Sequence, residues 1–334
     1  MNIHQWDSQI KKFNKSFENS APKKQWNDNT IANMHRFKKE NSIWNTQGQY
    51  FGAKEKAIVL VGASPRLAED VEKLKEIDEN FIIICANSAL KYLLKHDIKP
   101  DYVVCIDSDD IDIPQHLDID RDDITLLASN VVCPEALDKW KGPVWYMPYY
   151  GVKKNIKAKL KKRIGREIAS GGNSMTEALW VATVVWGAHT IIFVANEYCF
   201  NKNYYADKEA AKQEKLKKRY PAIDANGNER WTLPALYTYV IWIERLCDNL
   251  TPPGYFIDTS FGLLGKDTKN IHRLKFEEAI EQVKTAFKIK EKLNKLNAKK
   301  EILTHIEARK NEQSEVFRYN MYQQRERILQ LNRS

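Results

Sequence analysis

The sequence contains no long hydrophobic stretch and no targeting pattern. No run in its 334 residues approaches the roughly eighteen apolar residues that a membrane-spanning helix needs. The first residues also lack the charged and apolar segments of a secretory signal. We therefore expect a cytoplasmic protein with no membrane span.

Cysteine and glycine are both scarce. The cysteines are odd in number and scattered, without C-x-x-C spacing, which argues against a disulfide framework and against a zinc site. We predict buried thiols at Cys85, Cys105, Cys133, Cys199 and Cys247. The 13 glycines form no Gly-x-Gly-x-x-Gly motif, so the usual dinucleotide fingerprint is absent.

The chain nevertheless has the composition of a folded protein. Hydrophobic residues make up 43% of it, with 9 Trp and 15 Tyr. Short apolar runs predict strands over 57–61, 81–86, 102–107, 125–128, 144–146 and 190–194, with 255–258 as a further candidate. Helical spacing alternates with them, at 68–77, 89–95 and 174–186. This alternation predicts an α/β fold with a doubly wound, mostly parallel, Rossmann-like sheet.

Two polar segments flank this central part. We expect residues 1–52 to form an N-terminal helical arm, 53–265 the nucleotide-binding domain and 266–334 a C-terminal helical extension. The arm has anchors at Trp6, Phe13, Phe17, Trp26, Met34, Phe37 and Trp44. The extension has helix-spaced apolar residues at Phe276, Ala279, Ile280, Val283, Phe287, Ile302, Leu303 and Ile306. It predicts a long helix or hairpin through which a homo-oligomer could form.

Two glycine-containing loops precede predicted helices. The loop Ser170-Gly171-Gly172-Asn173-Ser174 leads into an apolar helical run, and backbone amides at such a helix start favour phosphate or carboxylate. The loop Gly62-Ala63-Ser64-Pro65 follows a buried strand in the same way. Ordinary turn chemistry also explains both sequences, and for the Gly62 loop a plain strand-to-helix turn is the favoured interpretation.

Polar residues follow the predicted strands, where a doubly wound sheet binds its ligand. They are Gly62 and Ser64, Asn87 and Ser88, Asp107 to Asp110, and Asn196 to Tyr198. The amide of Asn87 can read a base or ribose. Asp107 and Asp109 are candidate Mg²⁺ ligands, because hard cations prefer carboxylate oxygen. A solvated turn is the favoured interpretation for Asp110, and a capping role is an equally weighted alternative for Asp107.

The net charge of +9 is unevenly distributed. Lys153–Arg166 holds eight basic residues and no acid, and 284–300 is also rich in lysine. We expect the first run to favour an anionic substrate or nucleic acid, because it leads directly into the Ser170 loop. For the second run, a solvated helix face is the simpler interpretation.

Several segments together resemble the 6-hydroxymethylpterin diphosphokinase MptE-like family, which includes motility accessory factors linked to flagellin glycosylation with nonulosonic acids. They are Ala57–Pro65, Cys85–Leu90, Asp97–Asp107, Ala169–Ser174, Gly187–Phe193 and Asp224–Asn228 with Trp231-Thr232 and Tyr239…Glu244. The resemblance spans roughly residues 30 to 265. The same loops are distantly similar to sialyltransferases that bind a cytidine-monophosphate sugar. The resemblance implies that Gly62, Ser64, Asn87 and Ser170–Ser174 line a nucleotide site; from the strand ends we add Ser88 and Asn196.

The chain departs from the family pattern at three places. Ala195-Asn196-Glu197 replaces Gly-x-Asp, Tyr204-Tyr205 replaces Thr-His, and Pro65-Arg66 stands where Pro-Ser is common. No histidine lies where we would assign a catalytic base. We therefore predict that Asp107 or Glu197 performs the acid–base work.

Three functions follow from these observations. The first is a Mg²⁺-dependent transferase that moves a diphosphate from a nucleotide such as ATP to a hydroxymethyl acceptor. The second is a glycosyltransferase that uses a CMP-sugar and a small-molecule or glycan acceptor. The third is a nucleotide- or nucleic-acid-binding protein without turnover. The aspartate cluster favours the first over the second, because the sialyltransferases that this chain resembles need no metal.

Overall fold

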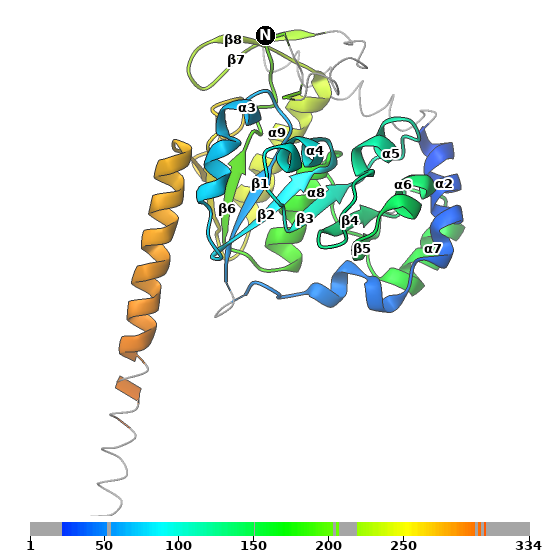
Figure 1. The fold of residues 1–334 in the computed structure, drawn as a ribbon, viewed down its shortest axis with the longest axis horizontal. Helices are drawn as coiled ribbons and strands as arrows, with labels where there is room; N and C mark the ends of the chain where they lie inside the picture. The colour runs from blue at the N-terminus through cyan, green and yellow to red at the C-terminus, as the bar shows by residue number, and fades with distance from the viewer. Residues whose placement is uncertain are drawn as a thin grey trace, which may run out of the picture. The chain divides into compact units, whose positions relative to one another are not determined.

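The computed structural model describes residues 22–51, 55–149, 151–202, 205–206 and 219–297, with 300, 301 and 304. The chain divides into two compact units, Met1–Ile280 and Glu281–Ser334. In the described part of the first unit lies an eight-stranded sheet of order β10-β9-β6-β1-β2-β3-β4-β5 (Figure 1). The strands are β1 (Ala57–Val61), β2 (Phe81–Ala86), β3 (Tyr102–Cys105), β4 (Thr125–Ser129), β5 (Val144–Met147), β6 (Thr190–Val194), β9 (Tyr255–Asp258) and β10 (Ile271–Arg273).

Every ladder of this sheet is parallel, which confirms the predicted fold class. All residues of β1 and β2 are buried, as expected for strands covered on both faces. The chain adds strands from β1 to β5 in one direction. It then returns to place β6 against the free side of β1. The order therefore reverses between β1 and β6, which is the point where doubly wound folds bind ligands.

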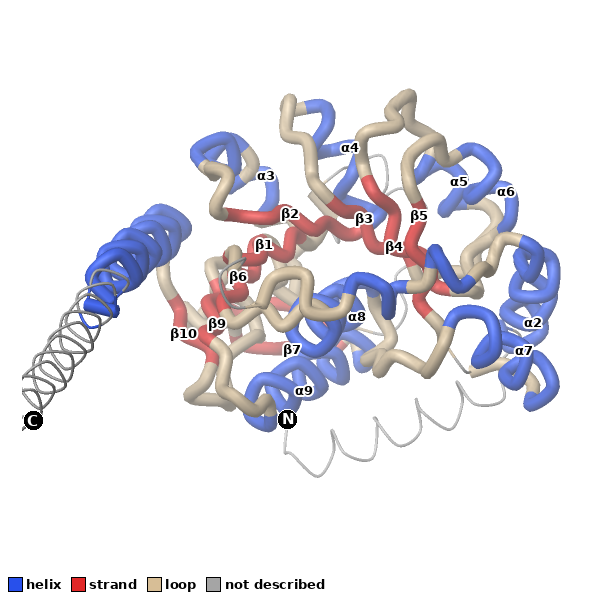
Figure 2. Tube along the Cα trace, turned by 90° about the horizontal axis from the view of Figure 1, so that it is seen from below, coloured by secondary structure: helices blue, strands red, loops and turns tan. Residues whose placement is uncertain are grey.

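Helices cover the two faces of the sheet. Figure 2 shows α3 (Leu67–Asp70), α4 (Asn87–Lys95), α5 (Asp112–Leu117) and α6 (Pro134–Lys139) on one face. On the other face lie α8 (Ser174–Trp180) and α9 (Pro234–Asn249). Local sequence explains where two of these helices begin. Asn173 and Thr176 form a capping box at the start of α8, and Pro234 occupies the first turn of α9.

Several element boundaries differ from the sequence-based expectation. Strand β3 ends at Cys105 rather than Asp107, because its pairing with β4 ends there. The helix predicted over 68–77 is α3 followed by a 3-10 turn, η5 (Glu72–Glu76), and α8 continues as a π-helical turn, η6 (Val181–Val185). The sheet extends past residue 265, because β10 pairs with β9. The hairpin of β7 (Tyr220–Ile223) and β8 (Glu229–Thr232) was not predicted.

The N-terminal arm packs beside β5 as helix α2 (Pro22–Ala32) and three 3-10 turns, η1 (Asn33–His35), η2 (Lys39–Asn41) and η3 (Ile43–Thr46). Trp26, Phe37 and Trp44 each make an edge contact with an aromatic ring of the main domain, namely Tyr149, Tyr146 and Trp180. Three of the predicted anchors, Trp6, Phe13 and Phe17, lie outside the described residues.

The basic run forms helix α7 (Lys154–Ile164), which packs against α2. Ile156, Leu160 and Ile164 of this helix are buried, and its lysines are exposed. Two basic side chains bind the arm. Arg163 donates to the carbonyl oxygen of Met34 at 3.0 Å, and the Arg166 guanidinium lies 4.1 Å from the centre of the Trp44 ring. These contacts assign part of the run to packing and leave its role toward anions a prediction.

The remaining sequence features concern cysteines and helices. All five cysteines are free and buried, as predicted. Residues 276–297 are helical, and Ile302, Leu303 and Ile306 lie outside the described residues. Across the described ranges, every helix is too short or too polar to cross a membrane.

Candidate active site

The loops after β1 and β6 are packed tightly against each other at the point where the strand order reverses. A Cβ atom at Gly62 would lie 2.3 Å from the carbonyl oxygen of Ala195, so only glycine fits there. The backbone N–H of Ser64 donates to the same carbonyl oxygen at 3.3 Å. The predicted role of Gly62 was close approach to a ligand. In the structure, the close approach is to the neighbouring loop.

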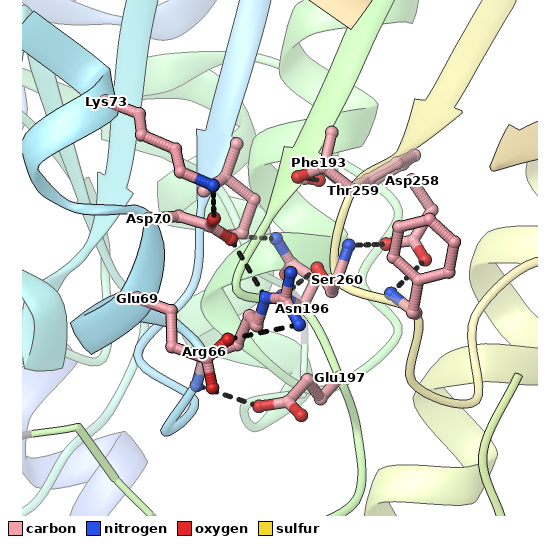
Figure 3. Close-up of polar contacts among 12 residues, drawn as sticks. Arg66, Glu69, Asp70, Lys73, Phe193, Asn196, Glu197, Asp258, Thr259 and Ser260 are labelled. Carbon is pink, nitrogen blue, oxygen red and sulfur yellow. Dashed lines mark hydrogen bonds and ion pairs between the residues drawn. The ribbon is translucent and has the colours of Figure 1, made fainter. Parts of the chain in front are cut away.

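Asn196 joins three strands from within this junction. Its side-chain nitrogen donates to the carbonyl oxygens of Leu60 (2.8 Å) and Val194 (2.9 Å). Its backbone N–H donates to the Ser260 hydroxyl at 2.8 Å, beyond the end of β9 (Figure 3). Both N–H donors of the buried amide are therefore used inside the protein. Any contact of Asn196 with a ligand would have to use its oxygen.

Glu197 is bound to the loop after β1. Its Oε2 accepts a hydrogen bond from the backbone N–H of Arg66 at 2.9 Å, while the Arg66 guanidinium pairs with Asp70 (Figure 3). Burial raises the pKa of Glu197, and the Ser64 hydroxyl and the Arg66 N–H oppose that rise. The Ser64 hydroxyl lowers the pKa of Glu197, although its distance and angle to the carboxyl do not meet the usual limits for a hydrogen bond. The structure thus gives Glu197 a loop-holding role, and its predicted catalytic role stays a prediction.

A second polar group lies where β2 ends and α8 begins. The Ser174 hydroxyl donates to Oδ1 of Asn87 at 3.1 Å, and Nδ2 of Asn87 lies 3.1 Å from Nδ1 of His116. Asn87 is buried at the first position of α4, and Ser88 follows it half-buried. Two predicted nucleotide-binding residues that are 87 positions apart in the sequence are therefore in direct contact.

Most backbone N–H groups of the Ser170–Ser174 loop donate to hydroxyl side chains in or next to the loop. The N–H groups of Gly171 and Asn173 donate to the Thr176 hydroxyl at 3.1 and 3.2 Å, and that of Gly172 donates to Ser170 at 3.1 Å. Gly172 has a φ of +101°, which favours glycine. This differs from the expectation that these amides receive a phosphate. The hydroxyl side chains of the loop satisfy them because the chain turns back on itself before α8.

Asp107 and Asp109 have different environments after β3. The Asp107 side chain is exposed to solvent, and many protein atoms also lie near its carboxyl group. This desolvation, and next the charge of Asp109, raise the pKa of Asp107 to about 6. One oxygen of Asp109 instead accepts the backbone N–H groups of Ile111 (2.8 Å) and Asp112 (2.7 Å), so Asp109 caps the turn into α5.

A third carboxyl, Glu177, lies near Asp107 and was not predicted. It belongs to the first turn of α8 and is 1% exposed. Burial raises its pKa to about 8, the Ser170 hydroxyl opposes that rise, and the charge of Asp107 adds to it. Its Oε2 has no hydrogen-bond partner. The charge of Asp107, in the loop after β3, thus acts on the carboxyl of Glu177 in α8.

Tyrosine side chains connect the two polar groups. The Tyr198 hydroxyl donates to Oδ1 of Asn196 at 3.3 Å. Burial raises the pKa of Tyr198, and a hydrogen bond with Asn173 opposes that rise. Burial, and then the charge of Asp107, raise the pKa of Tyr239. Hydrogen bonds of Tyr198 therefore link the β6 loop to the α8 loop, and Tyr239 lies within electrostatic range of Asp107.

The carboxylates of the candidate site can be compared with the ligands that the predicted Mg²⁺ ion would require. Among the described residues, no group of three or more His, Cys, Asp or Glu side chains is placed to hold a metal. Mg²⁺ is commonly bound through one or two carboxylates together with substrate phosphates. Asp107 fits that mode because solvent reaches it, whereas an oxygen of Asp109 is already used in capping. Asp107 is thus the residue that would hold the ion.

Sequence analysis missed Glu177, His116 and Tyr239. Glu177 carried a signal, since it is a lone acid inside the apolar run that forms α8. A buried acid in such a run is typical of a functional site. His116 carried no comparable signal, because tertiary packing alone brings α5 to this edge. Tyr239 belongs to a segment that resembles the family, but no site role was assigned to it.

Comparisons with known proteins agree with this architecture. No curated protein matches the chain. One solved structure, the MAf glycosyltransferase from Magnetospirillum magneticum AMB-1, resembles it with a TM-score of 0.53 and 15% sequence identity. The match covers 74% of this chain and 41% of that chain, and it shows the fold alone. A family model for 6-hydroxymethylpterin diphosphokinase MptE-like proteins matches residues 28–203, which is more than half of the chain. The chain therefore belongs to the 6-hydroxymethylpterin diphosphokinase MptE-like family.

Proposed function

We propose that this protein is a nucleotide-dependent transferase that moves a diphosphate from a nucleotide to a hydroxymethyl-type acceptor. Family membership and the fold support a nucleotide-related transferase in general. The observation that carries the finer proposal is the contact between Asn87 and Ser174 beside the accessible carboxylate of Asp107. All three lie at the carboxyl edge of the sheet, where doubly wound folds bind nucleotides.

The polar groups of the site have distinct roles in this proposal. Asn87, held by Ser174, contacts the base or ribose of the nucleotide. Ser88 and the exposed surface of the Ser170–Ser174 loop border the phosphates. A Mg²⁺ ion held by Asp107 would neutralise the negative charge of the phosphates. The glycine-constrained junction around Gly62 and Asn196 supports the site by fixing the positions of β1 and β6.

The chemical step balances without further reactants. The acceptor hydroxyl oxygen forms a bond to the β-phosphorus of ATP. The bond from that phosphorus to the α–β bridging oxygen breaks, and AMP leaves with the electron pair. The hydroxyl proton is released to solvent water, and Asp107 stays ionised as the group that would hold the metal ion. The products are AMP and the diphosphate ester of the acceptor.

Product analysis tests this proposal. The full-length protein is incubated with ATP, GTP or CTP, with Mg²⁺, and with 6-hydroxymethylpterin or its 7,8-dihydro form as acceptor probe. We expect a nucleoside monophosphate and a pterin diphosphate in equal amounts by chromatography. Formation of a nucleoside diphosphate, or the absence of turnover with every nucleotide, would contradict diphosphate transfer.

A glycosyltransferase that uses a CMP-sugar is the second candidate. It is supported by the resemblance of the fold to the MAf glycosyltransferase. Calorimetric titration with CMP, CDP, ATP and GTP, each with and without Mg²⁺, separates the two functions. Metal-dependent binding of ATP supports diphosphate transfer. Metal-independent binding that is tightest for CMP supports glycosyl transfer.

A further inference from the structure

Helix α7 carries a dense set of basic side chains and no acid. The basic residues are Lys154, Lys157, Lys159, Lys161, Lys162 and Arg163. All of these lysines are exposed. Within the described ranges, no acidic side chain pairs with Lys154, Lys159, Lys161 or Lys162. The outer face of α7 therefore presents positive charge to the solvent.

The stability of α7 does not account for this charge pattern. Lys154 begins the helix, and its first turn contains no acid, although positive charge at that end opposes the helix dipole. Lys154 and Lys157 are three positions apart, as are Lys159 and Lys162, and like charges at this spacing repel each other. The buried residues of α7 are all apolar, so packing does not require the lysines. The pattern is better explained by an anionic partner.

Tertiary structure extends this charge beyond α7. Helix α7 packs against α2 and η2, and Figures 1 and 2 show α2 and α7 side by side at the β5 end of the sheet. At the start of α7, the backbone N–H of Lys153 donates to Oδ1 of Asn27 at 2.8 Å, close to the two lysines of α2. At its end, Arg163 donates to the carbonyl oxygen of Phe37 at 3.3 Å, directly before two further lysines. We call the surface formed by Lys23, Lys24, Lys38, Lys39 and the lysines of α7 the basic strip.

We propose that the basic strip binds the phosphate backbone of a nucleic acid without reading its base sequence. A lysine ammonium binds phosphate as a point charge. Lys154 and Lys162 are about 12 Å apart along the helix axis, a length over which each strand of a duplex carries about three to four phosphates. The apolar residues of α7 are buried, so the helix has none to insert into a lipid surface. It also contains no aromatic residue on which a base could stack.

This binding goes beyond the proposed function, because the basic strip shares no residue with the candidate active site. Fluorescence anisotropy tests it, with the full-length protein titrated into a labelled DNA duplex of about 20 base pairs at about 50 to 200 mM salt. We expect the affinity to fall about a hundredfold over this range, as for about four phosphate contacts. A second duplex of unrelated sequence should bind with the same affinity.

Two double variants locate the binding. Lys154→Gln with Lys161→Gln removes two charges from one side of α7, because the two residues are two helical turns apart. We expect the slope of log affinity against log salt to become shallower by about 2, since each phosphate contact contributes about 0.9. The matched control is Lys91→Gln with Lys95→Gln, which removes two exposed lysines from α4 and gives the same net charge. We expect the control to keep the slope of the unmodified protein, and circular dichroism verifies that both variants are folded.

Several outcomes would overturn the proposal. It is wrong if the unmodified protein does not bind the duplex at about 50 mM salt. It is also wrong if the two double variants lose affinity equally, because overall charge rather than the basic strip then explains binding. Equal or tighter binding of polyglutamate or of phosphatidylserine vesicles would assign the strip to an acidic protein or to a lipid surface instead. A strong preference for one of the two duplex sequences would contradict binding through the backbone alone.

Discussion

Asp107 and Asp109 are two residues apart in sequence, yet their side chains have different environments. An oxygen of Asp109 caps the turn into α5, while the Asp107 carboxyl is accessible and has a pKa raised to about 6. A carboxyl with such a pKa is ionised above about pH 6 and can accept a proton at neutral pH. The difference arises from where the backbone of the β3 loop directs each side chain.

The first prediction concerns the charge of Asp107. Asp107→Asn removes the carboxylate but keeps the shape, and we expect turnover to fall by roughly 10²- to 10⁴-fold. In the unmodified protein, turnover should rise as pH increases through about 6, because the ionised carboxylate of Asp107 then accumulates; the variant should lack this rise. Asp97→Asn is the control, because Asp97 is exposed and precedes the start of β3, at the end of the strand opposite Asp107. An unchanged pH profile in Asp107→Asn would remove Asp107 from the chemistry.

The second prediction concerns the amide of Asn87. Asn87→Ala removes the contact with Ser174 and the proposed contact with the nucleotide. We expect nucleotide affinity to fall about tenfold, which corresponds to one lost hydrogen bond of roughly 1–1.5 kcal/mol. Isothermal titration calorimetry measures the change. Asn80→Ala, an exposed position just before β2, should bind as the unmodified protein does. Equal affinities for the two variants would show that Asn87 does not bind the nucleotide.

The third prediction concerns stability and the protonation of Glu177. The pKa of this group is about 8 in the folded protein, against 4.5 for an exposed glutamate. Between those values the folded state keeps a proton that the unfolded state releases, so stability falls as pH rises through this window. Glu177→Gln cannot ionise. We expect the variant to be more stable than the unmodified protein at pH 8.5, by about 2 kcal/mol or more, since one pKa unit corresponds to about 1.4 kcal/mol.

Thermal unfolding across pH checks this third prediction. The gain in Tm should be absent near pH 4.5 and largest above pH 8. Part of the decline in stability should remain in the variant, because burial also raises the pKa of Asp258 to about 7. A variant that is less stable than the unmodified protein at every pH would contradict the expected protonation of Glu177.

At the scale of elements, the junction of β1 with β6 determines how the candidate site is supported. The two following loops touch at Gly62 and Ala195, and Asn196 connects them to β9 through Ser260. The site itself lies on the other side of β1, at the ends of β2 and β3 and the start of α8. We therefore propose that the junction acts as a rigid support, and that α8 with the ends of β2 and β3 supplies the groups of the candidate site.

The fourth prediction tests this support. Gly62→Ala would place a Cβ 2.3 Å from the Ala195 carbonyl oxygen, so the two loops must separate. We expect a loss of roughly 1–3 kcal/mol of stability, the usual effect of overpacking. Chemical denaturation measures this loss. A fully stable Gly62→Ala protein would show that the loops separate easily and that the junction is not a rigid support.

At the scale of the whole molecule, the sheet includes a strand that lies beyond the expected domain boundary at residue 265. Strand β10 pairs with β9, and Phe276, Ala279 and Ile280 are buried within the same compact unit. In the second unit, the described helical residues Ile289, Leu293 and Leu296 are exposed at spacings of four and three. Such spacing is typical of a helix that associates with another helix.

The fifth prediction separates these two parts by truncation. A chain ending at Ile280 keeps β10, and we expect it to fold with unchanged nucleotide affinity. A chain ending at Gly265 loses β10 and the buried residues after it, and we expect a clearly lower Tm. If the C-terminal helix mediates self-association, light scattering should show a smaller mass for the Ile280 chain than for the full chain. A Gly265 chain with unchanged Tm would contradict the role given to β10.

The sequence by itself determined the fold class and the edge of the sheet at which the candidate site was predicted. Continuous apolar runs such as Ala57–Val61 and Phe81–Ala86 predict strands buried on both faces, and the structure has these strands with the same bounds. Burial of apolar residues depends on local pattern, so it can be read from the chain. The polar residues after these strands were likewise identified because strand ends are local features.

Only the tertiary structure decided which polar atoms are already satisfied and which are left for a ligand. Asn196 and Ser260 are 64 positions apart, and Ser174 and Asn87 are 87 apart. No local pattern encodes such pairs. The same applies to Glu177, whose second oxygen has no partner once α8 has packed onto the sheet. Hydrogen bonds are short and directional, so their presence or absence depends on the relative positions of elements that are distant in the sequence.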